Sequence, residues 1–553
     1  MDRAGKIHIF SPGVCKKVLT TTQTQATIAG MLTVIDHTGR EIKVPVEPGE
    51  TLARAVFSDW YVSPRPLCSG LGRCAMCRVR FEGSAPEPVD AERLRLTDKE
   101  LEQGWRMSCR HRAENGITVH LPPPLSGPNR WYSPHAKNAA ITGVAVDLGT
   151  TSVQWEAYAG KTVVARGSEL NPQIGIGSEV MSRLAYATGW SGSDRLRSLV
   201  RERLAEIMAG LNAGDAELCV AGNPAMIYLL LGRDVSGLSR APYFLDWNGG
   251  EEMLLAVDLP PVYVPPLIAP FVGADISAGM AHLLWSGQGF AYPFMLADMG
   301  TNGEFILAVD KDTWLGASVP LGPALEGIGL TFGCAAEPGA ITAFALTPQG
   351  LSPRFVEDFG ECPGVTGTGY LSLAQSLLAV GIMEPDGGFV EQKQASSISP
   401  LAARLARQLT TAWGEQRFVF KGEVWSDQAM YLTGDDVEAL LKVKAAFNVA
   451  FTKLLSRAGL TQNDLTAVYL AGAMGRHVSV RDLEELGFIP PGMGLRVHQV
   501  GNLSLAGAGF LLRHPELREE LAKTAAKVKV LDLASEYGFG RSYVRNMVFT
   551  FTG

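Results

Sequence analysis

The chain has 553 residues, of which 46% are hydrophobic and 19% are charged. This much apolar material supports sizeable cores in about three to five domains and excludes intrinsic disorder over most of the chain. With 49 Lys and Arg against 56 Asp and Glu, the net charge of −7 also argues against a general nucleic-acid binder.

The N-terminal residues 1–30 are predicted to form a polar extension, which is rich in Thr and Gln between positions 20 and 27. This segment lacks the continuous apolar stretch of a secretory signal, and the sequence shows no membrane span. We therefore expect a cytoplasmic protein, in which structural disulfides are rare. Eight cysteines in such a chain require a metal or redox explanation wherever they cluster.

A small β-grasp domain is predicted over residues 31–122. Its first segment alternates apolar and polar residues around a turn, which is typical of a β-hairpin. The elements expected in chain order are a hairpin at 31–46, a helix that begins near Leu52, a strand at 78–82, a helix at 98–103 and a strand at 117–120.

Four cysteines of this domain have a spacing that suits an inorganic cofactor. Cys68, Cys74 and Cys77 follow the pattern C-x5-C-x2-C, and Cys109 comes after 31 intervening residues. Four thiolates bind either zinc or a 2Fe–2S cluster. The small residues of the loop 69–73 favour the cluster, because they let backbone N–H groups point at the sulfurs, and a zinc ribbon normally has two C-x2-C pairs. The pattern resembles vertebrate-type 2Fe–2S ferredoxins.

A proline-rich linker is expected over 123–140, because such segments are extended and semi-rigid and space two domains. The rest of the chain is predicted to be α/β, with apolar strands alternating with amphipathic helices. One long helix is predicted at 436–458. Asp435 and Glu438 resemble a capping box at its start, and Gly459 is placed to end it.

An Asp-x-Gly-Thr motif occurs twice, at 147–150 and 298–301, each time between two apolar strands. This internal repeat predicts two related lobes, at 141–290 and 291–553. A Gly-containing turn presents backbone N–H groups and Thr hydroxyls to phosphate, and an Asp at the strand end can hold Mg²⁺. A third motif, the apolar strand 467–471 followed by Gly472 and Ala473, lets the base and sugar of a nucleotide approach the backbone.

These three motifs resemble the phosphate-1, phosphate-2 and adenosine motifs of the actin/sugar kinase/Hsp70 ATPase superfamily. The resemblance implies a two-lobed, RNase H-like ATPase domain that binds ATP and Mg²⁺. It gives Asp147 and Asp298 catalytic roles and assigns Glu304 to orienting the attacking water. The nucleotide-binding residues that it implies are Gly149, Thr150, Thr151, Gly300, Thr301, Asn302, Gly303, Gly472 and Ala473.

A ferredoxin domain joined to such an ATPase resembles one family, the reductive activators of corrinoid proteins. The likeness extends from Met31 over nearly the whole chain and includes the segments 220–224, 270–275 and 337–341. It implies that the 2Fe–2S cluster, driven by ATP hydrolysis, passes an electron to a corrinoid protein of a methyltransferase system and reduces Co(II) to Co(I). It also implies an upstream low-potential donor such as a ferredoxin, and a homodimer.

Two alternatives are open at the level of the sequence. A sugar or small-acid kinase with a regulatory redox domain would release a phosphorylated product and would keep its turnover after the change Cys68→Ser. A non-enzymatic, redox-sensing ATP switch would bind its partners while its cluster kept one oxidation state. A flavin or nicotinamide reductase is disfavoured, because we find no convincing G-x-G-x-x-G motif after a predicted strand.

Overall fold

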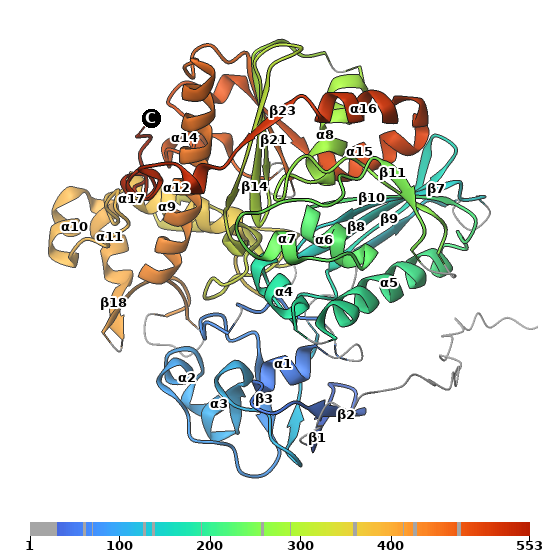
Figure 1. Cartoon of the computed structure of the whole chain (residues 1–553). Coiled ribbons are helices and arrows are strands. Elements are labelled where there is room, and N and C mark those ends of the chain that lie inside the picture. Colours follow the sequence, from blue (N-terminus) through green and yellow to red (C-terminus); the bar gives the residue numbers. More distant parts are fainter. Residues whose placement is uncertain are drawn as a thin grey trace, which may run out of the picture.

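The computed structural model describes residues 30–58, 62, 64–68, 70–124, 129–134, 139–189, 191–255, 259–287, 289–357, 362–412, 414–423, 429–472 and 477–552. The predicted extension lies outside the described residues except for Gly30, and Ala473 of the predicted adenosine motif also lies outside them. An N-terminal domain, a middle region and a C-terminal region follow one another along the chain (Figure 1). Within the described ranges, no helix is both long and apolar enough to cross a lipid bilayer.

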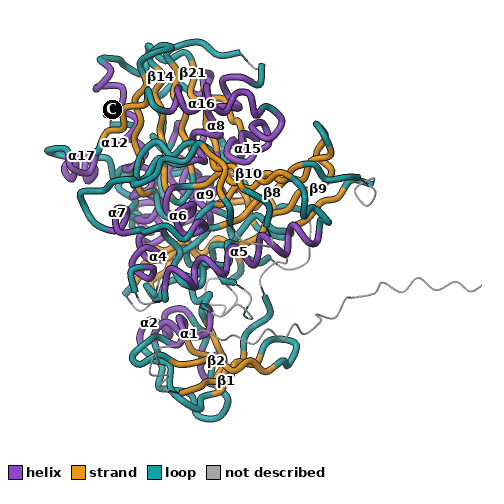
Figure 2. Tube along the Cα trace, turned by 45° about the vertical axis from the view of Figure 1, so that its right-hand side comes forward, coloured by secondary structure: helices purple, strands orange, loops and turns teal. Residues whose placement is uncertain are grey.

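The N-terminal domain lies at one end of the molecule in both ribbon views (Figures 1 and 2). Its elements are β1 (Gly30–Ile35), β2 (Glu41–Val46), α1 (Leu52–Phe57), β3 (Arg78–Phe81), α2 (Asp90–Arg95), α3 (Asp98–Glu102), β4 (Trp105–Met107) and β5 (Thr118–His120). They form a sheet in the order β2–β1–β5–β3–β4. Every second residue of β2 is buried, so the alternation in the sequence places one face of the hairpin in a core that α1 covers.

The middle region contains a seven-stranded sheet in the order β11–β12–β10–β7–β8–β9–β6. Its strands are β6 (Asn129–Tyr132), β7 (Gly143–Leu148), β8 (Ser152–Ala159), β9 (Thr162–Leu170), β10 (Glu217–Gly222), β11 (Glu251–Met253) and β12 (Val262–Val264). Its helices are α4 (Val180–Ala187), α5 (Gly192–Gly210), α6 (Pro224–Leu231), α7 (Ser236–Ser239) and α8 (Ala274–Trp285).

Part of the segment predicted as a linker is built into this sheet. β6 pairs antiparallel with β9 along four residues, from Asn129 opposite Ser168 to Tyr132 opposite Ala165. The expectation that 123–140 packs into neither domain is therefore wrong for 129–132. Strand pairing satisfies the backbone of this short edge strand, although its side chains stay exposed.

The C-terminal region is organised around a six-stranded sheet in the order β22–β21–β13–β14–β15–β23. The strands of the region are β13 (Phe294–Met299), β14 (Asn302–Ala308), β15 (Trp314–Pro320), β16 (Ile341–Thr347), β17 (Gly350–Phe355), β18 (Leu409–Ala412), β19 (Glu415–Lys421), β20 (Met430–Thr433), β21 (Ala467–Ala471), β22 (Val497–Gly501) and β23 (Val528–Leu531). Its helices are the 3₁₀ helix η3 (Pro323–Glu326), α9 (Gly367–Ala379), α10 (Gln392–Ile398), α11 (Pro400–Leu405), α12 (Gly434–Ala458), α14 (Val480–Glu485), α15 (Leu503–Arg513), α16 (Arg518–Ala525) and α17 (Phe539–Arg545).

The two large sheets repeat one arrangement. β7, β8 and β9 run antiparallel to one another, and β10 runs parallel to β7; β13, β14 and β15 run antiparallel, and β21 runs parallel to β13. The Asp-x-Gly-Thr motifs occupy the equivalent turns β7–β8 and β13–β14. The sequence repeat is therefore also a structural repeat.

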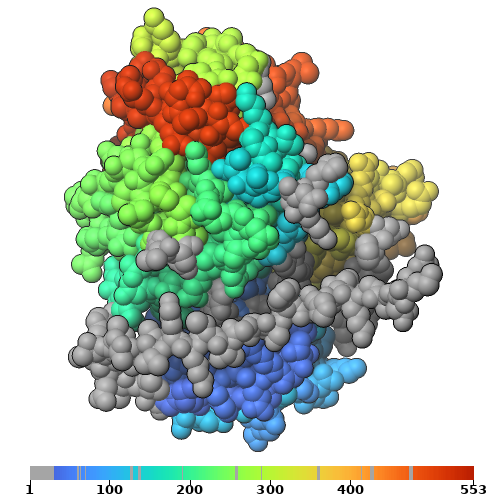
Figure 3. Space-filling view, turned by 90° about the vertical axis from the view of Figure 1, so that its right-hand side faces the viewer, coloured from blue at the N-terminus to red at the C-terminus, as the bar shows by residue number. Residues whose placement is uncertain are grey.

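The two lobes meet through α8 and α15, which pack side by side. α8 packs on the C-terminal sheet, and α15 packs on β7 and β10 of the middle sheet. The helices approach so closely that a Cβ atom on Gly507 would lie 1.9 Å from the carbonyl oxygen of Ala278, so only glycine fits there. Figure 3 shows the C-terminal helices (red) against the middle region (green). A helix of the C-terminal region therefore packs on the middle sheet.

The long helix α12 begins two residues before its predicted start. Thr433 and Asp436 form its capping box, and the side chain of Thr433 accepts a hydrogen bond from the backbone N–H of Asp436 at 3.1 Å. The predicted pairing of Asp435 with Glu438 is wrong, because the first helical residue is Gly434 rather than Asp436. Gly459 ends the helix in the left-handed conformation, as predicted.

Candidate functional site

The two Asp-x-Gly-Thr turns touch each other where the lobes meet. The hydroxyl oxygens of Thr151 and Thr301 are 3.2 Å apart, although the two residues are 150 positions apart in the sequence. Both side chains are buried. Hydroxyls from the two turns thus meet at one point, as a site that binds a phosphate chain from both sides requires.

Side chains from other elements fix the first turn. The Nδ2 of Asn171 donates to the carbonyl of Gly149 at 2.7 Å, and the Nδ2 of Asn223 donates to the hydroxyl of Thr150 at 3.0 Å. The guanidinium of Arg183 donates to the carbonyl of Thr150, and this arginine is fully buried. Burial lowers the pKa of Arg183 to about 9. Arg183 was not identified from the sequence, because its position on α4 carries no phosphate-binding pattern.

Asp147 near the end of β7 accepts hydrogen bonds from the start of α15, in the C-terminal region. One carboxylate oxygen accepts from the Nδ2 of Asn502 at 2.7 Å, and the other accepts from the hydroxyl of Ser504 at 2.8 Å. Asn502 caps α15 and Ser504 lies in its first turn. The orientation of this carboxylate therefore depends on how α15 sits on the middle sheet.

The second turn joins Thr301 to η3 and to the adenosine motif. The hydroxyl of Thr301 donates to Glu326 at 2.9 Å, and the half-buried Asn302 and buried Gly303 begin β14. Gly472 has a φ of +89°, and a Cβ there would lie 2.7 Å from a carboxylate oxygen of Asp298. The backbone after β21 thus lies directly against the phosphate-2 aspartate, at the carboxyl end of the strand. Gly300 lies in the tight turn itself, where its N–H donates to the carbonyl of Asn302 at 3.0 Å.

Five carboxylates are grouped around these turns: Asp147, Asp275, Asp298, Glu304 and Glu326. Withdrawal from water raises the pKa of Asp275 to about 7, and withdrawal from water and the charges of Asp275, Asp147 and Glu326 raise that of Asp298 to about 8. Burial and the charges of Asp275 and Asp298 also raise the pKa of Glu304, which is 5% exposed and faces Asp298 across the β13–β14 pair.

This chemistry fits a divalent cation. The carboxylate oxygens of this group lie at half-buried positions and repel one another. A bound Mg²⁺ would offset this repulsion with its positive charge. In the described part of the chain, no three such side chains are grouped as direct ligands of one ion. Since Mg²⁺ usually keeps several water ligands, contact through one or two carboxylates and through water suits this group. Asp275 and Glu326 were not assigned to the site from the sequence, although Asp275 ends the segment 270–275.

The raised pKa values predict how the stability of the nucleotide-free protein depends on pH. A carboxyl group whose pKa rises from about 4 to about 8 on folding makes the folded state bind more protons, so the free energy of unfolding falls as pH rises between these values. We expect the melting temperature to fall from pH 5.5 to 8 without Mg²⁺. The fall should be shallower in Asp298→Asn, measured by calorimetry; equal slopes in both proteins would contradict this assignment.

The four cysteines of the N-terminal domain come together in two pairs. The thiols of Cys68 and Cys74 are in hydrogen-bonding contact, and so are those of Cys77 and Cys109. The contact with Cys74 lowers the pKa of Cys68 to about 5, with further donation by the backbone N–H groups of Arg73, Cys74 and Gly72. Two pairs of thiols suit a 2Fe–2S cluster, in which each iron takes two cysteine ligands.

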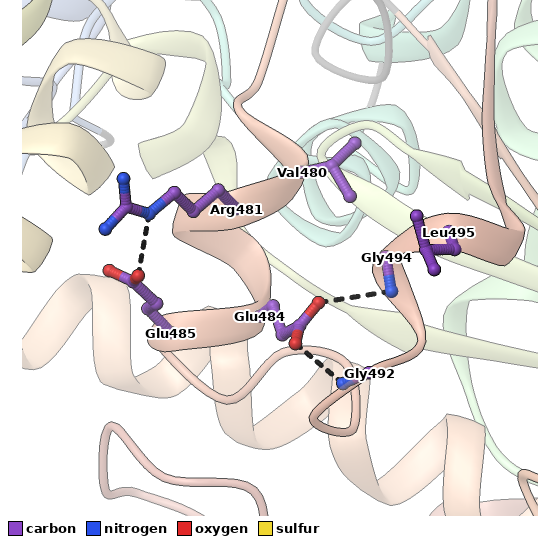
Figure 4. A pocket seen from close by; sticks show the side chains of 7 residues that line it. All are labelled: Val480, Arg481, Glu484, Glu485, Gly492, Gly494 and Leu495. Carbon is purple, nitrogen blue, oxygen red and sulfur yellow. Dashed lines mark hydrogen bonds and ion pairs between the residues drawn. The ribbon is translucent and has the colours of Figure 1, made fainter.

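A cavity of the described structure lies away from the predicted site residues. A cavity of about 330 Å³ is formed between α14 and the loop 492–495, where Glu484 accepts hydrogen bonds from the N–H groups of Gly492 and Gly494 (Figure 4). None of the predicted site residues lines it.

Comparisons with known proteins agree with this geometry. Residues 293–553 match a model described as the C-terminal domain of RACo, the ASKHA domain; residues 142–284 match the RACo middle region; residues 35–114 match the 2Fe-2S iron-sulfur cluster binding domain. These matches confirm the predicted fold class, a ferredoxin-like domain joined to an actin/sugar kinase-like domain.

Two curated proteins are similar over most of their length. The corrinoid activation enzyme RamQ of Eubacterium limosum is 28% identical over 434 residues, which cover 75% of this chain and 71% of that one. The [Co(II) methylated amine-specific corrinoid protein] reductase of Methanosarcina barkeri is 25% identical over 459 residues, covering 73% and 76%. A solved structure titled reductive activator for corrinoid, iron-sulfur protein has a TM-score of 0.65 at 19% identity and covers 94% of this chain and 99% of that one.

Proposed function

The chain belongs to the family of reductive activators of corrinoid proteins, and on this premise we propose that it uses ATP to drive an electron from its 2Fe–2S cluster onto the Co(II) of a corrinoid protein. The product is Co(I), the nucleophile that methyl transfer requires. The observation that carries the ATP-driven part is the 3.2 Å contact of Thr151 with Thr301, which joins the two phosphate loops between the lobes.

At the nucleotide, the residues of this chain have separable tasks. The N–H groups of the two turns and the hydroxyls of Thr150, Thr151 and Thr301 bind phosphate oxygens. Asp147 and Asp298 hold Mg²⁺, directly or through water, and Mg²⁺ when bound neutralises the charge of the phosphates. Burial and the charges of Asp275 and Asp298 raise the pKa of Glu304, and this carboxyl group orients the attacking water. The adenosine motif at Gly472 is assigned to the base and sugar of the nucleotide.

At the other end of the chain, the four thiolates of Cys68, Cys74, Cys77 and Cys109 hold the cluster, which supplies a one-electron carrier. The loop between the first two cysteines reaches the surface, where Leu71 is 63% exposed. Exposed arginines nearby, among them Arg78 and Arg110, suit an acidic, low-potential electron donor such as a ferredoxin. Electrons therefore enter and leave on this face of the domain.

ATP is needed because Co(II) accepts an electron only at very low potential. Since a bound nucleotide contacts both lobes, it favours the closed arrangement of the lobes. A corrinoid partner that binds the closed and open states with different affinity is therefore bound more or less tightly as ATP is hydrolysed. Docking of the partner thus couples the free energy of ATP hydrolysis to the electron transfer. A homodimeric assembly and a cytoplasmic location are parts of the same proposal.

The proposal is tested by mixing the protein anaerobically with a Co(II) corrinoid protein, a reductant and Mg-ATP. We expect Co(I) to appear in the visible spectrum with ATP and only at the background rate without it. Equal rates with and without ATP would remove the ATPase from the mechanism. A phosphorylated sugar or acid in place of Co(I) would favour the kinase alternative.

A further inference from the structure

Two ion pairs join the N-terminal domain to the C-terminal region, one from the cluster loop (residues 68–77) and one from the end of α2. The Nε of Arg73 lies 3.4 Å from Asp435 at the start of α12, and the Nη1 of Arg95 lies 3.4 Å from Glu415 at the start of β19. The side chain of Arg95 is only 6% exposed, whereas those of Arg73 and Asp435 are 37% and 44% exposed. Because water screens the first pair, the Arg95–Glu415 pair is the stronger contact.

Arg95 also reaches a cluster ligand through a single peptide unit. Its Nε donates to the carbonyl of Arg73 at 3.1 Å. The N–H of the same peptide unit, which is that of Cys74, donates to the sulfur of Cys68. Hydrogen bonds to the sulfurs are one of the means by which a protein sets the reduction potential of an iron–sulfur cluster. A displacement of Glu415 is thus transmitted to the surroundings of the cluster.

Arg417 connects Glu415 to Tyr431 on β20. Arg417 donates to Glu415 at 2.9 Å, and its guanidinium stacks 4.3 Å above the ring of Tyr431. The hydroxyl of Tyr431 in turn donates to the carbonyl of Leu94 in the N-terminal domain at 3.5 Å. The face of β19 and β20 therefore meets the N-terminal domain as one unit.

The segment 326–332 connects this face to the nucleotide site. It begins at Glu326, which accepts from Thr301 of the phosphate-2 turn at 2.9 Å. At its other end the ring of Phe332 lies 5.0 Å from that of Tyr431. Between them, the N–H and hydroxyl of Thr331 donate to Asp436 in the capping box of α12 at 2.8 and 3.0 Å. This segment therefore contacts Asp436, which follows Asp435 in the chain, and Tyr431, which Arg417 connects to Glu415.

We propose that Arg95 and Glu415 are positioning residues through which nucleotide bound between the lobes acts on the iron–sulfur loop. This inference rests on the proposed function, since it needs both an ATP site and a cluster. Linkage is reciprocal, so a nucleotide that changes the reduction potential of the cluster must itself bind with different affinity to the oxidised and the reduced protein. The magnitude expected for such coupling is about fivefold or more in Kd.

The test measures the Kd of Mg-AMP-PNP for the full-length protein, once oxidised and once reduced by one electron with dithionite. We expect the two Kd values to differ by about fivefold or more in the wild type and to become equal within error in Glu415→Gln. Tyr431→Phe, which removes only a hydroxyl, should reduce the difference and serves if the first variant folds poorly. Glu423→Gln, an exposed carboxylate just after β19, is the matched control and should leave the difference unchanged.

The outcomes separate this inference from the proposed function. A wild-type protein that binds the nucleotide and the cluster but shows equal Kd values in both redox states overturns the coupling and leaves the function standing. A difference that persists in Glu415→Gln overturns the route through Arg95 and Glu415. Absence of nucleotide binding or of iron would overturn the proposed function, and the inference with it.

Discussion

Replacing Asp298 by asparagine is expected to lower ATP hydrolysis by about two to three orders of magnitude, the scale of losing one preorganised electrostatic group at a reacting phosphate. The same change should raise the melting temperature of the nucleotide-free protein at pH 7. The pKa of Asp298 is raised to about 8, because burial and the charges of Asp275, Asp147 and Glu326 make its ionisation costly in the folded protein. An uncharged amide at this position removes that cost. Phosphate release and calorimetry measure the two effects.

Opposite signs for activity and stability distinguish a functional carboxylate from a structural one. Asp386, an exposed residue that accepts a hydrogen bond from the N–H of Gly388 at 2.9 Å, provides the control. Asp386→Asn should change neither hydrolysis nor the effect of Mg²⁺ on the melting temperature. If Asp298→Asn hydrolysed ATP at the wild-type rate, the phosphate-2 turn would lose its role in the mechanism.

Replacing Cys77 by serine is expected to abolish ATP-dependent formation of Co(I), down to the rate without enzyme. Cys77 is 2% exposed and pairs with Cys109, so serine removes one of the two sulfur ligands expected for one iron. The purified variant should be nearly colourless and contain fewer than two irons per chain, while basal ATP hydrolysis persists because no phosphate loop contacts this cysteine among the described residues. Iron analysis, the visible spectrum and phosphate release measure these properties.

Cys362→Ser is the matched control for this experiment. Cys362 is half-buried, and its thiol lies 3.5 Å from the carbonyl of Gly364, far along the chain from the cluster loop. This variant should keep two irons and the wild-type rate of Co(I) formation. Cobalt reduction by Cys77→Ser at the wild-type rate would show that the electron reaches the corrinoid protein without passing through the predicted cluster.

Features encoded in short stretches of sequence were predictable. The hairpin β1–β2, the two Asp-x-Gly-Thr turns and the end of α12 at Gly459 each depend on neighbouring residues, because alternation, turn chemistry and helix termination act over a few positions. The family resemblance followed from these local motifs and from their order.

Other local patterns were misread because a competing interaction lay outside the window. Asp436 takes part in the capping box of α12 from within the first turn of the helix. Its carboxylate also accepts a hydrogen bond from the N–H of Thr331, which is 105 positions away. Residues 129–132 were predicted as part of the linker because an exposed edge strand carries little hydrophobic pattern. Their pairing with β9 depends on residues far along the chain.

The sequence by itself therefore determined which groups are candidates for the chemistry of this protein: four cysteines, two Asp-x-Gly-Thr turns and the aspartates near the ends of their strands. Only the tertiary structure decided how these groups are oriented and connected. Asn502 reaches Asp147 across 355 positions, Asp275 and Glu326 join the carboxylate group, and Arg95 meets Glu415 across 320 positions. Hydrogen bonds and charges act through space, and contacts between residues so far apart in the chain leave no periodic trace in it.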